Sequence, residues 1–163
     1  MTFAVKRLDN ITISNFARMM PSFMELPNTK PLWDDQKTER LIDSILNNIP
    51  IGPIFLMRHP RQIVGPSGWA YEYQILDGYS RINAILEFGS GYFRLSDDFR
   101  FFESEFVQVG GMTLKDIKET YPMLAKRFAE YLLDIQVVEA SSKLEIARMF
   151  ERLDIQSFCF GRE

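Results

Sequence analysis

The stretch A-Y-E-Y-Q-I-L-D-G-Y-S-R-I-N-A-I-L-E-F-G, residues 70–89, decides the fold because it predicts a strand, a turn and a helix in that order. Residues 70–76 are rich in aromatic and branched side chains, which is typical of a β-strand. Residues 77–78 are Asp-Gly, a pair that favours tight turns. Apolar residues then recur at helical spacing, at Ile82, Ile85 and Leu86.

The rest of the chain also mixes helical and strand patterns. A second clear helix is expected after Asp34 or Asp35, because either carboxylate can cap its first turn. We expect further helices over residues 15–24, 113–118 and 121–132 and from Ser142 onwards, strands over 11–13, 53–58, 91–95 and 132–139, a mobile loop over 59–68, and a hairpin or loop over 97–109. This mixture predicts one small α+β domain over residues 1–163. No stop signal follows the last helix, so the chain can be a fragment or a reduced version of a longer protein.

Composition limits the classes of function. The net charge is −3, from 19 basic and 22 acidic residues, which argues against a domain coated with basic charge for duplex DNA. One local basic pocket remains compatible with that balance. The single cysteine, Cys159, cannot form an internal disulfide, and no apolar run reaches the length of a membrane span. We therefore expect a cytoplasmic protein that does not enter a membrane.

The turn at residues 77–81, Asp-Gly-Tyr-Ser-Arg, has two interpretations. In the structural one, Ser80 caps the helix and Arg81 is a solvated surface residue. In the functional one, the unpaired N–H groups that begin the helix form an anion site. Gly78 would then allow close approach, and Arg81 would supply a planar charged fork for phosphate oxygens. The neighbouring Asp77 carboxylate would suit a metal ion, a hydroxyl or an attacking water.

Three segments resemble one known family in order and spacing. They are W-D-D-Q-K-T-E-R-L-I-D-S-I-L-N-N-I-P-I-G-P-I over residues 33–54, I-L-D-G-Y-S-R-I-N-A-I over 75–85, and F-E-R-L-D over 150–154. The family comprises the N-terminal domains of GmrSD-type, modification-dependent restriction enzymes, and the resemblance covers about residues 26–154. Its members have an Asp-Gly-Gln-Gln-Arg motif and a ParB/sulfiredoxin-like fold. The resemblance therefore implies a small mixed sheet flanked by helices.

The resemblance implies binding of a nucleoside triphosphate, GTP or ATP, at this turn. In several members, hydrolysis of the nucleotide licenses DNA cleavage by a partner nuclease domain. Asp77, Gly78 and Arg81 match the family motif, whereas Tyr79 and Ser80 replace its two glutamines. A Gln amide can orient a water or bond a phosphate. Tyr offers a hydroxyl at a longer distance from the backbone, and Ser offers one at a shorter distance. Binding should therefore survive this change more easily than hydrolysis.

The resemblance also carries roles to other positions. Asp77 is the expected catalytic and metal-binding residue, with Mg²⁺ as the bridging ion, because Mg²⁺ usually binds through one or two carboxylates and substrate phosphates. Arg152 matches the family's Phe-Glu-Arg-Leu-Asn stretch, in which Asp154 here replaces Asn, and Gln36 matches the family's Gln after Trp33. Both are expected near the nucleotide. The alternative for each is an ordinary polar residue on a solvated helix face.

Other candidate sites are weaker. His59 is the only histidine, so the chain has neither a usual zinc-ligand set nor a histidine-based nuclease motif. An aromatic cluster could stack nucleic-acid bases, and it comprises Phe99, Phe101, Phe102 and Phe106. Glu103 and Glu105 lie among these rings and would repel phosphates, so a core or a partner-facing surface is expected instead.

Two hypotheses about function follow. The first is a nucleotide-binding domain in DNA restriction or phage defence, with weak NTP hydrolysis as its candidate activity. The second is a catalytically silent module of the same fold that binds DNA or a protein partner. Which nucleotide, which DNA modification and which oligomeric state apply is left open by the sequence.

Overall fold

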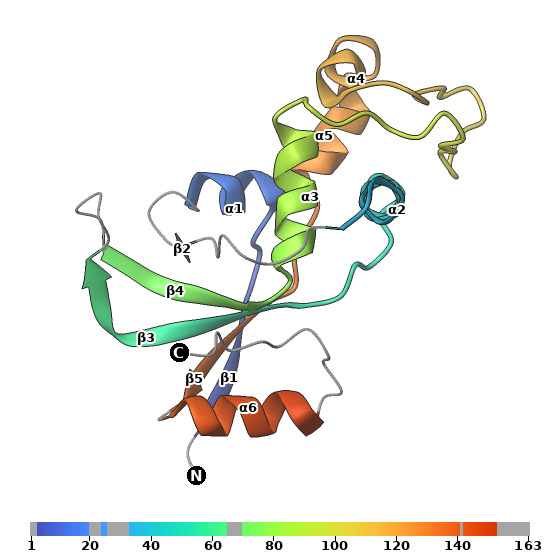
Figure 1. Ribbon diagram of the computed structural model, residues 1–163. Coiled ribbons are helices and arrows are strands. Elements are labelled where there is room, and N and C mark those ends of the chain that lie inside the picture. The colour runs from blue at the N-terminus through green and yellow to red at the C-terminus, as the bar shows by residue number, and fades with distance from the viewer. Residues whose placement is uncertain (1–2, 20–23, 26–32, 65–69, 141, 153–163) are drawn as a thin grey trace.

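The computed structural model describes residues 3–19, 24–25, 33–64, 70–140 and 142–152 (Figure 1). Its centre is a mixed five-stranded sheet with the order β1-β5-β3-β4-β2. The strands are β1 Phe3–Leu8, β2 Met24–Glu25, β3 Ile54–Val64, β4 Ala70–Asp77 and β5 Ile135–Ala140. β3 pairs antiparallel with β4 and parallel with β5, while β1 and β2 form the two edges. The α+β class predicted from the sequence is confirmed.

Helices lie on both sides of the sheet (Figure 1). They are α1 Ile13–Met19, α2 Asp35–Leu46, α3 Tyr79–Gly89, α4 Leu114–Thr120, α5 Pro122–Glu130 and α6 Lys143–Arg152. Side chains alternate between the two faces of a strand. Ile54 and Leu56 of β3 therefore join the main core with α1 to α5, and Phe55 packs with Ile146 and Met149 of α6. The start of α3 and the whole of α6 thus lie on opposite faces.

Local capping signals predicted the helix starts well. The Asp34 carboxylate accepts the Lys37 N–H at 2.8 Å and begins α2. Thr113 and Asp116 form a capping box that begins α4. Each cap satisfies N–H groups that have no partner within the helix itself. Both starts follow from short polar side chains within three residues of the N–H groups that they serve.

Several expected elements differ from the structure. Residues 59–64, expected as a loop, continue β3, because they reach across to the start of β4, where Val64 pairs with Ala70. An irregularity between Arg58 and Ile63 accommodates Pro60, which has no N–H for the ladder. The strand expected over residues 11–13 is wrong, since Ile13 begins α1. No strand forms over residues 91–95, where an isolated bridge at Arg94 is all that remains. Residues 97–109 form a loop, which is one of the two alternatives expected for them.

α2 ends at Leu46, and the apolar residues of its buried face are Leu41, Ile42, Ile45 and Leu46. The helix expected over residues 121–132 is shorter in the structure. α5 ends at Glu130, because Tyr131 adopts an extended conformation with ψ 129°. Leu132 lies outside the helix and is exposed. The strand expected to begin at Leu132 begins at Ile135.

Candidate functional site

The turn after β4 has the backbone geometry that an anion site needs. Asp77 ends β4 opposite Phe55, and Gly78 follows in a left-handed conformation with φ 96°. The first helical hydrogen bond of α3 runs from the Ile82 N–H to the Gly78 carbonyl at 2.9 Å. The three preceding N–H groups, of residues 79–81, come before this bond. Gly78 is the N-cap and Ser80 lies inside the helix, so the prediction that Ser80 caps α3 is wrong.

Gly78 is fixed by packing as well as by its backbone angle. A Cβ atom at this position would lie 3.0 Å from Cγ1 and 3.3 Å from Cα of Ile54. Contacts this short force a neighbour to move, and the left-handed conformation adds strain for any residue with a side chain. The close approach of β3 to the turn therefore requires glycine here.

Arg81 is held at two points. Its Nη2 donates to Asp77 Oδ2 at 2.9 Å and to the Pro53 carbonyl at 2.8 Å. The Arg81 and Asp77 side chains are only 19% and 15% exposed. Within the described part of the chain, the buried Arg81 Nε has no hydrogen-bond partner. Arg81 is thus neither a solvated surface residue nor an unengaged phosphate ligand, and its remaining donor capacity lies on Nε and Nη1.

A glycine loop passes close to this guanidinium. Gly52 has φ 82°, and a Cβ there would lie 3.9 Å from Arg81 Nη1. Gly52 and Pro53 together bring backbone, rather than side chains, against the arginine. Tyr79 and Ser80, which follow Gly78 in the first turn of α3, are half-buried. The arrangement gathers three helix-start amides and a positioned guanidinium, which is a combination suited to phosphate oxygens.

Gln36 and Arg152 make no polar contact with this turn in the described part of the chain. Gln36 is exposed in the first turn of α2, and Arg152 is exposed at the end of α6, on the other face of the sheet from α3. Among the described residues, neither side chain makes a hydrogen bond or ion pair with residues 77–81. Their nucleotide-binding roles remain predictions.

Asp77 fits a metal ion only in a restricted way. The described residues contain no group of three or more Asp, Glu, His or Cys side chains that could hold a metal. Asp77 would be a single protein ligand for Mg²⁺, and its Oδ2 already accepts a hydrogen bond from Arg81. Mg²⁺ with so few protein ligands takes the others from water and phosphate. Asp77 therefore fits an ion that arrives with a triphosphate.

A separate groove of about 1070 Å³ opens beyond Gly52. Its wall includes Ile51, Phe101, Met123, Leu132 and Arg127, which come from loops and from the α5 region. The lining residues do not include Asp77, Gly78 or Arg81. This groove has no signal in the sequence, because its lining comes from segments far apart in the chain.

The charges in this groove are already matched. Glu103 bonds Arg127 at 2.5 and 2.8 Å, Arg7 Nε lies 3.0 Å from Asp134 Oδ1, and Lys126 lies 3.7 Å from Glu130. The Arg127 guanidinium donates both hydrogen bonds to the Glu103 carboxylate and so lowers the pKa of Glu103. Burial raises the pKa of the Tyr131 phenol. The wall mixes apolar and charged side chains, and because these basic side chains are paired with acidic ones, the groove does not favour a polyanion.

Comparison with known proteins identifies a family for this chain. The family model described as GmrSD restriction endonuclease, N-terminal domain, matches residues 32–157, which is most of the chain. No curated protein and no solved structure matches. No helix within the described ranges is long and apolar enough to cross a membrane. The chain therefore belongs to the family of GmrSD restriction endonuclease N-terminal domains.

Proposed function

We propose that this chain is the nucleotide-binding module of a DNA restriction system and that it holds the phosphates of GTP or ATP at the start of α3. Membership of the family links the chain to DNA restriction and phage defence, and to a nuclease partner domain. Nucleotide binding is the more specific step that we add. A ParB/sulfiredoxin-like origin of the fold belongs to the same proposal and is supported by the strand–glycine–helix turn of a small mixed sheet.

The observation that carries the proposal is the position of Arg81 in the first turn of α3, directly after a left-handed glycine. Its Nη2 is tied to Asp77 and to the Pro53 carbonyl, so the guanidinium has little freedom left to lose when an anion binds. Its buried Nε lacks a partner among the described residues. A buried donor without an acceptor is unfavourable, and a phosphate oxygen would satisfy it if the groups that cover Nε moved aside.

Each residue of the turn has a separate proposed role in binding the nucleotide. The amides of residues 79–81 bind phosphate oxygens at the positive end of α3. Arg81 neutralises phosphate charge through donors that Asp77 does not use. Asp77 would hold Mg²⁺ that arrives with the triphosphate, and the ion would neutralise further phosphate charge. Tyr79 and Ser80 contribute hydroxyls where the family has amides, so we expect binding with weak hydrolysis.

Calorimetric titration of GTP and ATP, with Mg²⁺, tests the proposal. Arg81→Ala should weaken binding at least about tenfold, the effect expected when a charged hydrogen-bond partner is lost. Arg148→Ala, at an exposed arginine of α6, is the matched control and should bind like the parent. Because Arg81→Ala also removes structural bonds, circular dichroism should show that the variant is folded. Absence of binding by the folded parent protein would reject the proposal.

Hydrolysis is tested separately by phosphate release. The double variant Tyr79→Gln/Ser80→Gln restores the family motif and should raise phosphate release above the parent value, since a Gln amide can orient the attacking water. Adding Asp77→Asn to that double variant should return release to the parent level or below. If the restored motif releases phosphate no faster than the parent, the identity of these two residues does not limit hydrolysis.

A second function is favoured by one observation. The Arg81–Asp77 ion pair and the bond to Pro53 already use part of the arginine for structure. A catalytically silent module that binds DNA or a protein partner would need no more than this. Duplex DNA binding by a parent protein that binds neither nucleotide would support this alternative.

A further inference from the structure

The connection from α2 to β3 comes against the start of α3 (Figure 1). Its last residues are fixed by two hydrogen bonds. The Ile54 N–H donates to the Asp134 carbonyl at 2.8 Å, and the Pro53 carbonyl accepts a bond from Arg81 at 2.8 Å. The backbone of Gly52, directly before these residues, is therefore held beside the arginine.

The Arg81 guanidinium has one donor group that is both unpaired and accessible. Its Nη2 donates to Asp77 and to the Pro53 carbonyl. Among the described residues, Nε and Nη1 make no hydrogen bond, and of these two atoms only Nε is buried. An anion can therefore reach the two N–H groups of Nη1 without displacing the groups that cover Nε.

Gly52 lies beside this open donor. The residue is exposed, and a Cβ atom there would lie 3.9 Å from Arg81 Nη1, in van der Waals contact. Apart from the residues next to Gly52 in the chain, no other described heavy atom lies within 4 Å of that position. A side chain at residue 52 would thus enter a space that is bordered by Nη1 and is otherwise open. A phosphate oxygen needs such a space, because it binds a charged nitrogen at about 2.7–2.9 Å.

We infer that Gly52 is a positioning residue of the phosphate site, because it leaves free the side of Arg81 Nη1 at which a phosphate oxygen binds. This inference rests on the proposed function and adds to it a residue outside the turn at 77–81. Gly78 packs on Ile54, two residues after Gly52, so both glycines lie at the same end of α3. The contact is with phosphate, so its contribution does not depend on the base.

The alternative explanation for a glycine at residue 52 is its backbone conformation alone. Its φ of 82° is left-handed, which disfavours most side chains whether or not a ligand binds. Gly91 separates the two explanations, because its φ is 81° and a Cβ there would meet nothing within 4 Å. Substitution of either glycine imposes a similar backbone strain, but only a side chain at residue 52 would cover the arginine.

Calorimetric titration of inorganic triphosphate, and of GTP and ATP with Mg²⁺, tests the inference. Gly52→Ala should weaken the binding of all three by about tenfold, the effect expected when a charged hydrogen bond is lost. Gly91→Ala is the matched control and should bind like the parent. Gly52→Asn and Gly91→Asn provide a second pair, since Asn adopts the left-handed conformation more readily than Ala. Urea denaturation should show similar losses of stability within each pair, and circular dichroism checks that the variants are folded.

A double variant tests whether residue 52 acts through Arg81. Gly52→Asn/Arg81→Ala should bind triphosphate no more weakly than Arg81→Ala, because the donor that the new side chain would cover is already absent. A purely structural effect of Gly52→Asn would instead add to the effect of Arg81→Ala. Additive losses would therefore overturn the inference.

The remaining outcomes separate this inference from the proposed function. A parent protein that binds the nucleotides, with equal affinities in the two members of each glycine pair, would overturn the role of Gly52 and leave the proposed function standing. A loss confined to GTP and ATP, or a parent that binds them but not inorganic triphosphate, would also overturn this role, because recognition would then depend on the base or the sugar. A parent that binds none of the three would reject the proposed function and this inference together.

Discussion

The Arg81 guanidinium lies 2.9 Å from the Asp77 carboxylate, and this ion pair joins the end of β4 to the first turn of α3. Arg81 also donates to the carbonyl of Pro53, just before β3. The two residues on which nucleotide binding is proposed are thus also part of the connection between two strands and a helix. Their contributions to stability and to binding have to be measured separately.

A double-mutant cycle measures the structural contribution of this pair. Arg81→Ala should lower the free energy of unfolding by about 1–3 kcal/mol, because it leaves the Pro53 carbonyl and a largely buried carboxylate without this donor. Asp77→Ala/Arg81→Ala should cost less than the sum of the two single variants, with a coupling of about 0.5–3 kcal/mol. Urea denaturation gives all four values, and simple additivity would show that the ion pair contributes nothing in solution.

Gly78, at the N-cap of α3, and Gly89, its last residue, form a matched pair. Gly78→Ala should destabilise the fold by about 1–3 kcal/mol, because the methyl group meets Ile54 and the backbone is left-handed. Gly89→Ala should be neutral or stabilising by up to about 1 kcal/mol, since its methyl group would meet nothing within 4 Å and Ala is the better helix former. Thermal and urea denaturation report both changes. Equal effects at the two positions would contradict the close packing of β3 against the turn.

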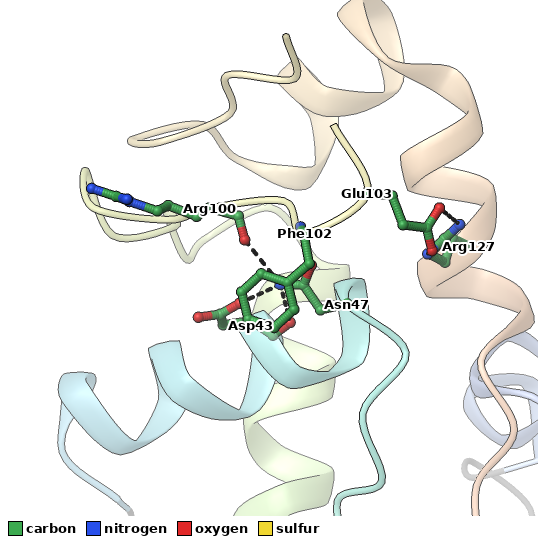
Figure 2. Close-up of polar contacts among 6 residues, drawn as sticks. All are labelled: Asp43, Asn47, Arg100, Phe102, Glu103 and Arg127. Atoms are coloured by element: carbon green, nitrogen blue, oxygen red, sulfur yellow. Dashed lines mark hydrogen bonds and ion pairs between the residues drawn. The ribbon is translucent and has the colours of Figure 1, made fainter. Parts of the chain in front are cut away.

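Asn47, at the end of α2, binds the segment between α3 and α4 through two hydrogen bonds, which hydrogen exchange can test (Figure 2). Its Nδ2 donates to the Arg100 carbonyl at 3.0 Å and its Oδ1 accepts the Phe102 N–H at 2.9 Å, and we call this pair of bonds the Asn47 clasp. Asn47→Ala removes both bonds. The Phe102 amide should then exchange at least about tenfold faster, because loss of one or two hydrogen bonds lowers the cost of local opening by about 1 kcal/mol or more. Asn15→Ala, on the surface of α1, is the control and should leave this amide unchanged. Unchanged exchange in Asn47→Ala would mean that this segment is held by other contacts.

Sequence patterns predicted what neighbouring residues determine. The starts of α2 and α4 followed from Asp34 and Thr113, because each cap acts within one helical turn. The extension of β3 through Val64 depends on pairing with β4, and edge strand β1 depends on β5, more than 120 residues later in the chain. Such long-range pairing has no local signal. The position of the turn at residues 77–81 was predictable, but the bond from Arg81 to Pro53 and the groove beyond Gly52 were not.

Asp43 provides a prediction about pH. Its carboxylate lies beside the Asn47 clasp and accepts a bond from Asn47 Nδ2 at 2.6 Å (Figure 2). Burial raises the pKa of Asp43 above its ordinary value of 3.8, and the bond from Asn47 offsets only part of this rise. Between 3.8 and the raised pKa, the folded chain binds more protons than the unfolded chain. The contribution of Asp43 to stability is therefore present in full below 3.8 and is lost as the pH rises through the raised pKa.

Asp43→Asn should remove this dependence. The Asn amide oxygen can still accept the bond from Asn47 and carries no charge to desolvate, so the variant should be more stable than the parent at neutral pH and nearly equal to it near pH 3. Glu103→Gln is a control for which the stability should change with pH in the opposite direction. The bond from Arg127 lowers the pKa of Glu103 below 4.5, so its contribution is present above that value and is lost as the pH falls through the lowered pKa. Urea denaturation from pH 3 to 8 compares the three proteins. A loss of stability in Asp43→Asn at neutral pH would show that the fold requires the charged carboxylate.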